Sequence, residues 1–312
     1  MNQENLEILK TFSKEDLPDL DVVTLGALEL FATEQVPSLD LVQLKRPLVI
    51  GSGNAQITGR ILFEGQDAVF ADESTYKVKL QAARGIDGAV LISASGSKHA
   101  GGIAKELKAR SIRTWLLTNN PEAPAKAFVD EEKVLLFPKN REPYTYNTST
   151  YMAMILAHTK ENTRQIYSFL LDEVAPLLPN TLSQYNSFFL LVPGEFDSIR
   201  EMFVTKFDEL FGPLLARRVF TPEQAKHAKT VVPSETELFL SFGTENPTFG
   251  KEQHRLFIPL PEGADYGAMM AVGYYVIGRI QKQFPPYFKQ HIGSYVREAS
   301  ELFGQKIAPI VE

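Results

Sequence analysis

Hydrophobic residues occur in short runs, separated by longer stretches in which apolar positions recur every three or four residues. The short runs have the length of buried strands, and the intervening stretches have the helical period. This alternation predicts βαβ units, in which helices cover both faces of a parallel sheet. The strands predicted in the first half are residues 47–50, 68–70, 88–92, 114–117 and 134–137.

Helical periodicity also predicts two helices before the first strand, over 3–12 and 22–32, and one long helix over 148–178. The second half repeats the strand plan in weaker form. The corresponding apolar runs are residues 187–192, 238–243 and 254–259, followed by a helix from Tyr266.

This correspondence predicts two doubly wound, mostly parallel α/β domains, the second shortened by a helix–strand–helix that occupies 98–132 in the first. The predicted segments are a helical part (1–45), a first domain (46–180) and a second domain (181–312). The alternative interpretation is that any two α/β domains look alike at this level of detail.

Composition narrows the function classes. The 32 Lys and Arg residues against 38 Asp and Glu give a net charge of −6, which argues against nucleic-acid binding. The absence of cysteine excludes disulfides, cysteine zinc sites and thiol nucleophiles. The first residues do not resemble a signal peptide and no run of 18 apolar residues occurs, so we expect a cytoplasmic protein without a membrane span.

Two loops follow predicted strands, at the edge where open α/β sheets bind ligands. The first, Gly51-Ser-Gly-Asn54, begins like a dinucleotide-binding fingerprint, but Gln56 stands where the third glycine belongs. Asp72 and Glu73 are the nearest acidic candidates after the second strand. A nucleotide-dependent oxidoreductase is therefore an alternative that rests on this Gly-x-Gly alone.

The second loop, residues 93–99, combines three serine hydroxyls, a helix start and Lys98. Hydroxyls, backbone N–H groups and a cation at a helix N-terminus are what a phosphate group needs. The same Ser-Gly-Ser sequence also suits an ordinary turn and helix cap, so spacing alone leaves both interpretations open.

These residues resemble the sugar isomerase (SIS) domain, in which a strand ending in Ser-x-Ser-Gly follows an upstream strand, Gly-x-Gly turn and helix. Residues 115–119 (Trp-Leu-Leu-Thr-Asn) and 146–150 (Tyr-Asn-Thr-Ser-Thr) are similar to two further segments of that family. The likeness covers about residues 45–170. The second half resembles, less specifically, the second SIS copy of glucosamine-6-phosphate synthase and of bifunctional phosphoglucose/phosphomannose isomerases.

The resemblance implies that a sugar 6-phosphate is bound in the first domain and that the reaction is an aldose–ketose isomerisation without a cofactor or metal. It also implies a homodimer. It assigns phosphate or substrate binding to Gly53, Asn54, Ser93, Ser95, Ser97, Lys98 and Ser149, and stabilisation of enediolate charge to Arg141.

Isomerisation needs a base that moves a proton between C1 and C2, and a partly buried Glu suits this role. Glu223 in Thr-Pro-Glu-Gln-Ala-Lys is similar to the family segment that carries the base, although Thr-Pro-Glu is also a good helix start. The family histidine for ring opening is missing, and its place falls near Glu237. His227, four residues after Glu223, is the candidate replacement. The missing histidine keeps a second interpretation open, a regulatory phosphosugar-binding protein without activity.

Overall fold

The computed structural model describes residues 1–228 and 233–312. Val232, which begins the Val-Pro segment between Glu223 and the expected place of the family histidine, lies outside the described residues. The chain divides into two compact units. The first-sheet unit comprises Thr33–Lys139 and Ser149–Lys160; the second-sheet unit comprises Met1–Ala32, Asn140–Thr148 and Glu161–Glu312. These units do not follow the predicted boundaries at 45 and 180. The N-terminal helices and the stretch after residue 160 group with the second sheet.

The first-sheet unit contains a five-stranded parallel sheet in the order β2-β1-β3-β4-β5. Its strands are β1 (Pro47–Ile50), β2 (Val69–Ala71), β3 (Gly88–Ile92), β4 (Thr114–Thr118) and β5 (Val134–Leu136). All five agree with the predicted runs to within one residue at each end. The central strands β1, β3 and β4 are buried along their whole length, because helices cover both faces of the sheet.

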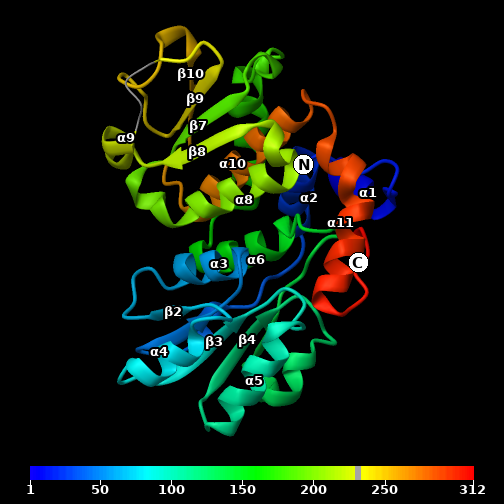
Figure 1. Ribbon diagram of the computed structural model, residues 1–312, viewed down its shortest axis with the longest axis vertical. Coiled ribbons are helices and arrows are strands. Elements are labelled where there is room, and N and C mark those ends of the chain that lie inside the picture. The colour runs from blue at the N-terminus through cyan, green and yellow to red at the C-terminus, as the bar shows by residue number, and fades with distance from the viewer. Residues whose placement is uncertain (229–232) are drawn as a thin grey trace. The chain divides into compact units, whose positions relative to one another are not determined.

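Helices α3 and α6 lie on one face of this sheet and α4 and α5 on the other (Figure 1). Their bounds are α3 (Asn54–Leu62), α4 (Tyr76–Ala82), α5 (His99–Ala109) and α6 (Thr148–Thr159). Side chains of α4 and α5, among them Tyr76 and Leu107, join the sheet in one buried cluster. On the opposite face α3 approaches β1 at Gly59, where a Cβ would lie 2.6 Å from Val49 Cγ1.

The second-sheet unit contains a four-stranded parallel sheet in the order β10-β9-β7-β8. Its strands are β7 (Ser187–Leu191), β8 (Ala216–Phe220), β9 (Glu237–Phe242) and β10 (Arg255–Ile258). Read from β8, this order matches β2-β1-β3-β4 of the first sheet and lacks an outer strand. Strand β8 escaped the sequence analysis because Arg217 and Arg218 interrupt its apolar pattern.

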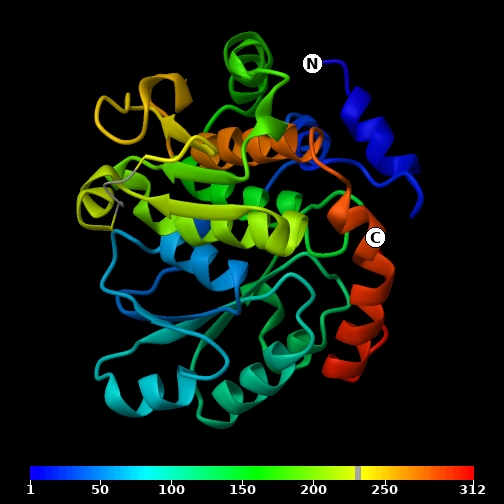
Figure 2. The ribbon, with the colours of Figure 1, turned by 45° about the horizontal axis from the view of Figure 1, so that its top comes forward.

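Helix α10 (Tyr266–Gln281) is the most buried helix of the second-sheet unit, since nearly all its residues are inaccessible to solvent. Helices α2 (Leu20–Phe31) and α8 (Arg200–Phe211) pack against it (Figures 1 and 2). Glycines allow this close approach: a Cβ on Gly278 would lie 2.0 Å from the Asp21 nitrogen, and one on Gly273 would lie 2.2 Å from Phe203.

The remaining elements of the second-sheet unit are α1 (Glu4–Thr11), α7 (Thr163–Phe169), α9 (Pro222–Ala228) and α11 (Tyr287–Phe303), with an antiparallel pair β6 (Glu142–Pro143) and β11 (Ile310–Val311). In the first-sheet unit, residues Pro124–Phe128 form a short 3-10 helix. Among the described residues, no helix combines the length and apolar character needed to span a membrane.

The single long helix predicted over 148–178 is wrong. Helix α6 ends at Thr159, Lys160 has a positive φ of 59°, and α7 begins at Thr163. The Asn162 side chain accepts hydrogen bonds from the backbone N–H groups of Arg164 (3.0 Å) and Gln165 (3.2 Å), which is N-cap geometry. This cap starts a new helix where apolar periodicity alone continued the old one.

Candidate functional site

The glycine turn (Gly51–Asn54) and the serine loop (Ser93–Lys98) lie beside each other at the carboxyl edge of the first sheet. They follow β1 and β3, which are neighbours with Ile50 opposite Leu91. From β1 the chain passes to β2 on one side and returns to β3 on the other. Ligands of open α/β sheets bind in the crevice at such a reversal of strand order. The topology thus brings together two loops that are about forty residues apart in sequence.

Hydroxyl and amide groups are concentrated in the serine loop. Ser93 Oγ accepts a hydrogen bond from the Gly96 N–H at 3.1 Å, and the Ser95 and Ser97 hydroxyls are 2.7 Å apart. Gly96 has φ +60°, and a Cβ there would lie 2.3 Å from Ala123 Cβ, so glycine is required. Ser95 is exposed and Ser93 and Ser97 are half-buried, so an anion can reach the loop.

Residues at the carboxyl end of β4 hold the serine loop in place by hydrogen bonds to its backbone. Thr118 Oγ1 and the Asn119 N–H donate to the Ala94 carbonyl at 3.0 and 3.1 Å. Asn120 Nδ2 donates to the Ser95 carbonyl at 2.9 Å. These contacts give a structural role to the Thr-Asn segment on which the family resemblance partly rests. Asn120 was not among the predicted site residues, although it is the next residue of the same polar segment.

Lys98 has a strained backbone directly before α5. Its φ and ψ are 52° and −120°, nearly those of Gly53 before α3, at 55° and −126°. This region of φ/ψ space favours glycine, and side chains that occupy it are concentrated at functional sites. The Lys98 side chain reaches solvent, yet partial desolvation lowers the pKa of its ammonium. A lysine in a glycine conformation marks this loop as more than an ordinary turn.

The glycine turn has the tight geometry that its sequence suggests. A Cβ on Gly51 would lie 2.5 Å from the Ala55 carbonyl carbon, and Gly53 has a positive φ. Asn54, the first residue of α3, is 8% exposed. The Ser52 hydroxyl donates to the Glu73 carboxylate at 2.6 Å, which ties the turn to the end of β2.

Ser149 is fully buried as the second residue of α6. The preceding N–H, that of Thr148, donates to the buried Glu142 carboxylate at 2.7 Å. A carboxylate therefore already compensates the first turn of α6, a position that a ligand anion would otherwise find favourable.

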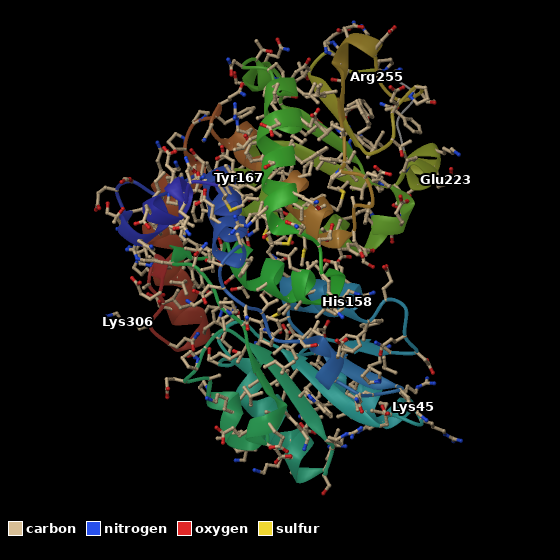
Figure 3. All side chains as sticks on the ribbon, turned by 180° about the vertical axis from the view of Figure 1, so that it is seen from behind. Lys45, His158, Tyr167, Glu223, Arg255 and Lys306 are labelled. Atoms are coloured by element: carbon tan, nitrogen blue, oxygen red, sulfur yellow. The ribbon has the colours of Figure 1, made fainter. Side chains whose placement is uncertain are left out.

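The residues predicted to be catalytic belong to the second-sheet unit. Glu223 lies in the first turn of α9, where its side chain is 78% exposed and forms an ion pair with Lys226 at 2.5 Å (Figure 3). His227 is exposed one turn later on the same helix. Glu223 thus lacks, within its own unit, the burial that was expected of a catalytic base.

Arg141 is engaged in contacts that hold the chain ends. Its Nε donates to Glu312 at 2.9 Å, a terminal nitrogen donates to the Phe12 carbonyl at 2.6 Å, and the guanidinium lies 4.3 Å from the centre of the Phe12 ring. Glu237, near the place of the family histidine, is buried and pairs with Arg218. Both side chains have structural partners in the second-sheet unit.

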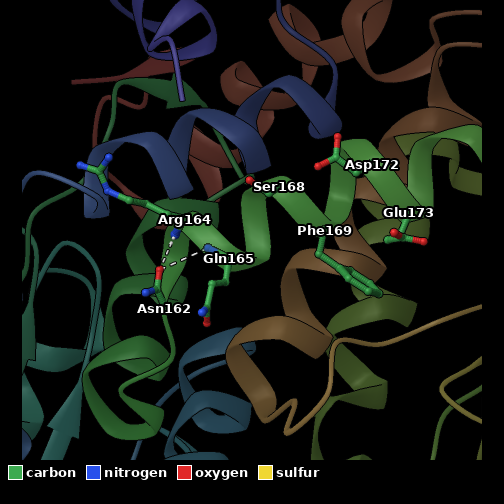
Figure 4. A pocket seen from close by; sticks show the side chains of 7 residues that line it. All are labelled: Asn162, Arg164, Gln165, Ser168, Phe169, Asp172 and Glu173. Atoms are coloured by element: carbon green, nitrogen blue, oxygen red, sulfur yellow. Dashed lines mark hydrogen bonds between the residues drawn. The ribbon is translucent and has the colours of Figure 1, made fainter.

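A surface pocket of about 470 Å³ lies in the second-sheet unit, along α7 and the short π-helix Leu170–Val174 that follows it (Figure 4). Its lining residues are Asn162, Arg164, Gln165, Ser168, Phe169, Asp172 and Glu173. Most of them are exposed, and Asn162 is occupied in capping α7. No group of three or more His, Asp or Glu side chains suited to a metal ion occurs in the described part of the chain.

The fold defines a class: an α/β protein with parallel sheets, as the strand pattern of the sequence predicted. No family model and no curated protein matches the chain. Among solved structures, it is similar to the C-terminal domain of glucosamine-fructose-6-phosphate aminotransferase from Francisella tularensis, with 10% identity, a TM-score of 0.62, and coverage of 89% of this chain and 99% of that one.

Two further structures are similar. A tagatose-6-phosphate ketose/aldose isomerase from Escherichia coli has 12% identity, a TM-score of 0.58, and coverage of 86% of each chain. A glucosamine-6-phosphate deaminase from Thermotoga maritima has 15% identity, a TM-score of 0.57, and coverage of 84% of this chain and 93% of that one. At these identities the likeness establishes the fold.

Proposed function

We propose that the chain binds a sugar phosphate at the carboxyl edge of the first sheet, with the phosphate on the serine loop. The observation that carries this proposal is the strained, hydroxyl-rich loop beside the glycine turn at the reversal of strand order. Backbone N–H groups at the start of α5 and the Lys98 ammonium supply positive charge locally. This local capture is needed because the net charge of −6 repels an anion at long range.

The proposed reaction is aldose–ketose isomerisation of a sugar 6-phosphate, with Glu223 as the base. Support comes from the likeness to a ketose/aldose isomerase and from the placement of Glu223 and His227 four residues apart on α9. The exposure of Glu223 and its ion pair with Lys226 favour the second candidate, a phosphosugar-binding protein without turnover.

Thermal protection tests the binding proposal. Glucose 6-phosphate, mannose 6-phosphate and fructosamine 6-phosphate are each titrated against the full chain, and a ligand at 100 times its Kd adds about 2.7 kcal/mol to the unfolding free energy. A Ser95→Ala/Ser97→Ala variant is expected to lose this protection. A Ser183→Ala control, at an exposed serine of the second-sheet unit, is expected to keep it. If no sugar phosphate raises Tm, the proposal is refuted; a shift with NAD alone would support the oxidoreductase instead.

Glu223→Gln separates the enzyme from the binding protein. Under the isomerase proposal, turnover of the bound sugar phosphate collapses while its Kd stays within about threefold, since binding energy and base catalysis reside in different groups. Wild-type chain that binds the ligand without converting it establishes the binding protein.

We further propose that the chain forms a homodimer, as the family resemblance implies. Light scattering of the eluted protein then gives about twice the 34.9 kDa chain mass. A particle of single-chain mass at working concentration contradicts this.

A further inference from the structure

Glu73 lies at the carboxyl edge of the first sheet, on the opposite side of the glycine turn from the serine loop. It follows β2, and its Oε2 accepts the Ser52 hydroxyl at 2.6 Å. Both side chains are exposed. Among the described residues, Ser52 is the hydrogen-bond partner of Glu73, so Oε1 is able to accept a hydrogen bond from a ligand.

The carboxyl edge of the first sheet therefore carries a negative charge on one side of the glycine turn and a positive charge on the other. In the strand order β2-β1-β3, a carboxylate stands after β2 and the cationic serine loop after β3. Neighbouring strands are about 4.8 Å apart, so these ends are separated by about 10 Å. A hexose chain that extends from a phosphate on the serine loop across β1 brings its far end to Glu73, whose carboxylate repels a second anion there.

In the described part of the chain, unpaired hydrogen-bond acceptors at the same edge of the sheet also favour a ligand that carries hydrogen-bond donors. The side-chain oxygens of Asn54, after β1, and Asn119, after β4, are buried and have no hydrogen-bond partner among the described residues. The two side chains are 8% and 5% exposed. Buried acceptors are normally satisfied, so this edge lacks donors. With Glu73, these oxygens favour a ligand that is rich in hydroxyl or amino groups.

We propose that Glu73, held by Ser52, determines specificity for the end of the ligand that lies farthest from the phosphate. This inference rests on the proposed function and narrows its substrate class to sugar monophosphates whose far end is a hydroxyl, carbonyl hydrate or amine. Aldonate phosphates and sugar bisphosphates are expected to bind more weakly, because both carry a second negative charge at that end.

Glucose 6-phosphate and 6-phosphogluconate test this directly, because they share the phosphate and differ at C1. Like charges about 4 Å apart in water weaken binding roughly fivefold, and more in a desolvated site. The wild-type chain is expected to bind glucose 6-phosphate at least about fivefold more tightly by calorimetry. Glu73→Gln reduces this ratio to below about twofold by tightening 6-phosphogluconate binding.

Glu64→Gln is the matched control, since Glu64 is exposed just beyond the end of α3. Because α3 runs back along the sheet, this charge is at the opposite edge, and its removal leaves the ratio unchanged. Inorganic phosphate binds wild type and Glu73→Gln equally if Glu73 acts on the far end. An unchanged ratio in Glu73→Gln, or a phosphate affinity altered as much as that of 6-phosphogluconate, overturns the inference while sugar-phosphate binding still supports the proposed function. Failure of the wild-type chain to bind any sugar phosphate refutes both.

Discussion

Lys98 has the same backbone conformation as two glycines of the chain, and two substitutions of it distinguish the effect of its backbone strain from the effect of its charge. Its φ and ψ of 52° and −120° match those of Gly53 (55°, −126°) and Gly212 (52°, −128°) at two other helix boundaries. Lys98→Gly relieves the backbone strain and removes the ammonium. Lys98→Met removes only the ammonium and leaves a side chain in the strained conformation.

The two variants are expected to differ in stability. A residue held in a sparsely populated φ/ψ region costs about 1–3 kcal/mol. Glycine also lowers the stability of the folded chain by about 0.5–1 kcal/mol, because it increases the conformational entropy of the unfolded chain. Lys98→Gly is therefore expected to be roughly 1 kcal/mol more stable than Lys98→Met, which should stay within about 0.5 kcal/mol of wild type.

The two variants are expected to agree in binding. A hydrogen bond to a charged group is worth about 1.5–3 kcal/mol, so both lose at least about tenfold in affinity for the sugar phosphate. Urea unfolding measures stability and calorimetry measures binding on the same samples. If Lys98→Gly is no more stable than Lys98→Met, the strain argument is wrong. If Lys98→Met binds like wild type, Lys98 does not contact the phosphate.

Three further changes test the packing around this site and the second-sheet unit. Asp72 accepts four hydrogen bonds from Ser74 and Thr75, which lower its pKa from 3.8 to about 2; Asp72→Asn loses about 1 kcal/mol above pH 4, and its urea midpoint converges with wild type as the pH falls through about 2. A gap that persists at pH 2 contradicts this linkage. Lys206→Met removes the fully buried ammonium that pairs with the half-buried Glu209 carboxyl, whose pKa is already raised by desolvation, and costs about 3–5 kcal/mol in urea unfolding, whereas Lys206→Met/Glu209→Leu recovers much of the loss. Equal losses in the single and double variants contradict that account. Gly96→Ala places a methyl group against the Ala123 Cβ and loses about 1–3 kcal/mol together with ligand protection; full protection in this variant disproves the proposed role of the loop.

The sequence predicted the first sheet well because its central strands β1, β3 and β4 are buried on both faces and each is followed by a polar loop. The glycine turn and the serine loop were both located on this pattern. That they lie side by side follows from the strand order of the sheet, in which β1 and β3 are neighbours. The strained backbone at Lys98 in the serine loop was not predictable, because a lysine in the sequence does not indicate a positive φ.

The hydrophobic pattern of the sequence missed strand β8 and the break between α6 and α7, and the structure gives a physical reason for each. Strand β8 lies at a sheet edge, where Arg217 pairs with Asp208 and Arg218 with Glu237, so its sequence lacks the apolar run of a central strand. The break at Lys160 depends on one capping side chain, Asn162, within a stretch of helical periodicity. Local polar contacts of this kind outweigh periodicity over one or two residues.

The proposed chemistry is hardest to predict because a catalytic group is defined by its surroundings. Glu223 has the right sequence context for both a base and a helix start, and α9 uses it at least as a helix start, with Lys226 as its partner. Arg141 shows the same ambiguity, since the side chain expected to stabilise an enediolate holds Phe12 and Glu312. Phosphate capture needs only a loop, which sequence encodes locally; proton transfer needs a desolvated carboxyl, which depends on what covers it. The binding proposal therefore rests on the geometry of the first-sheet unit alone. The isomerase proposal requires in addition that ligand or a second copy bury Glu223, and the comparison of Glu223→Gln binding with its turnover decides that point.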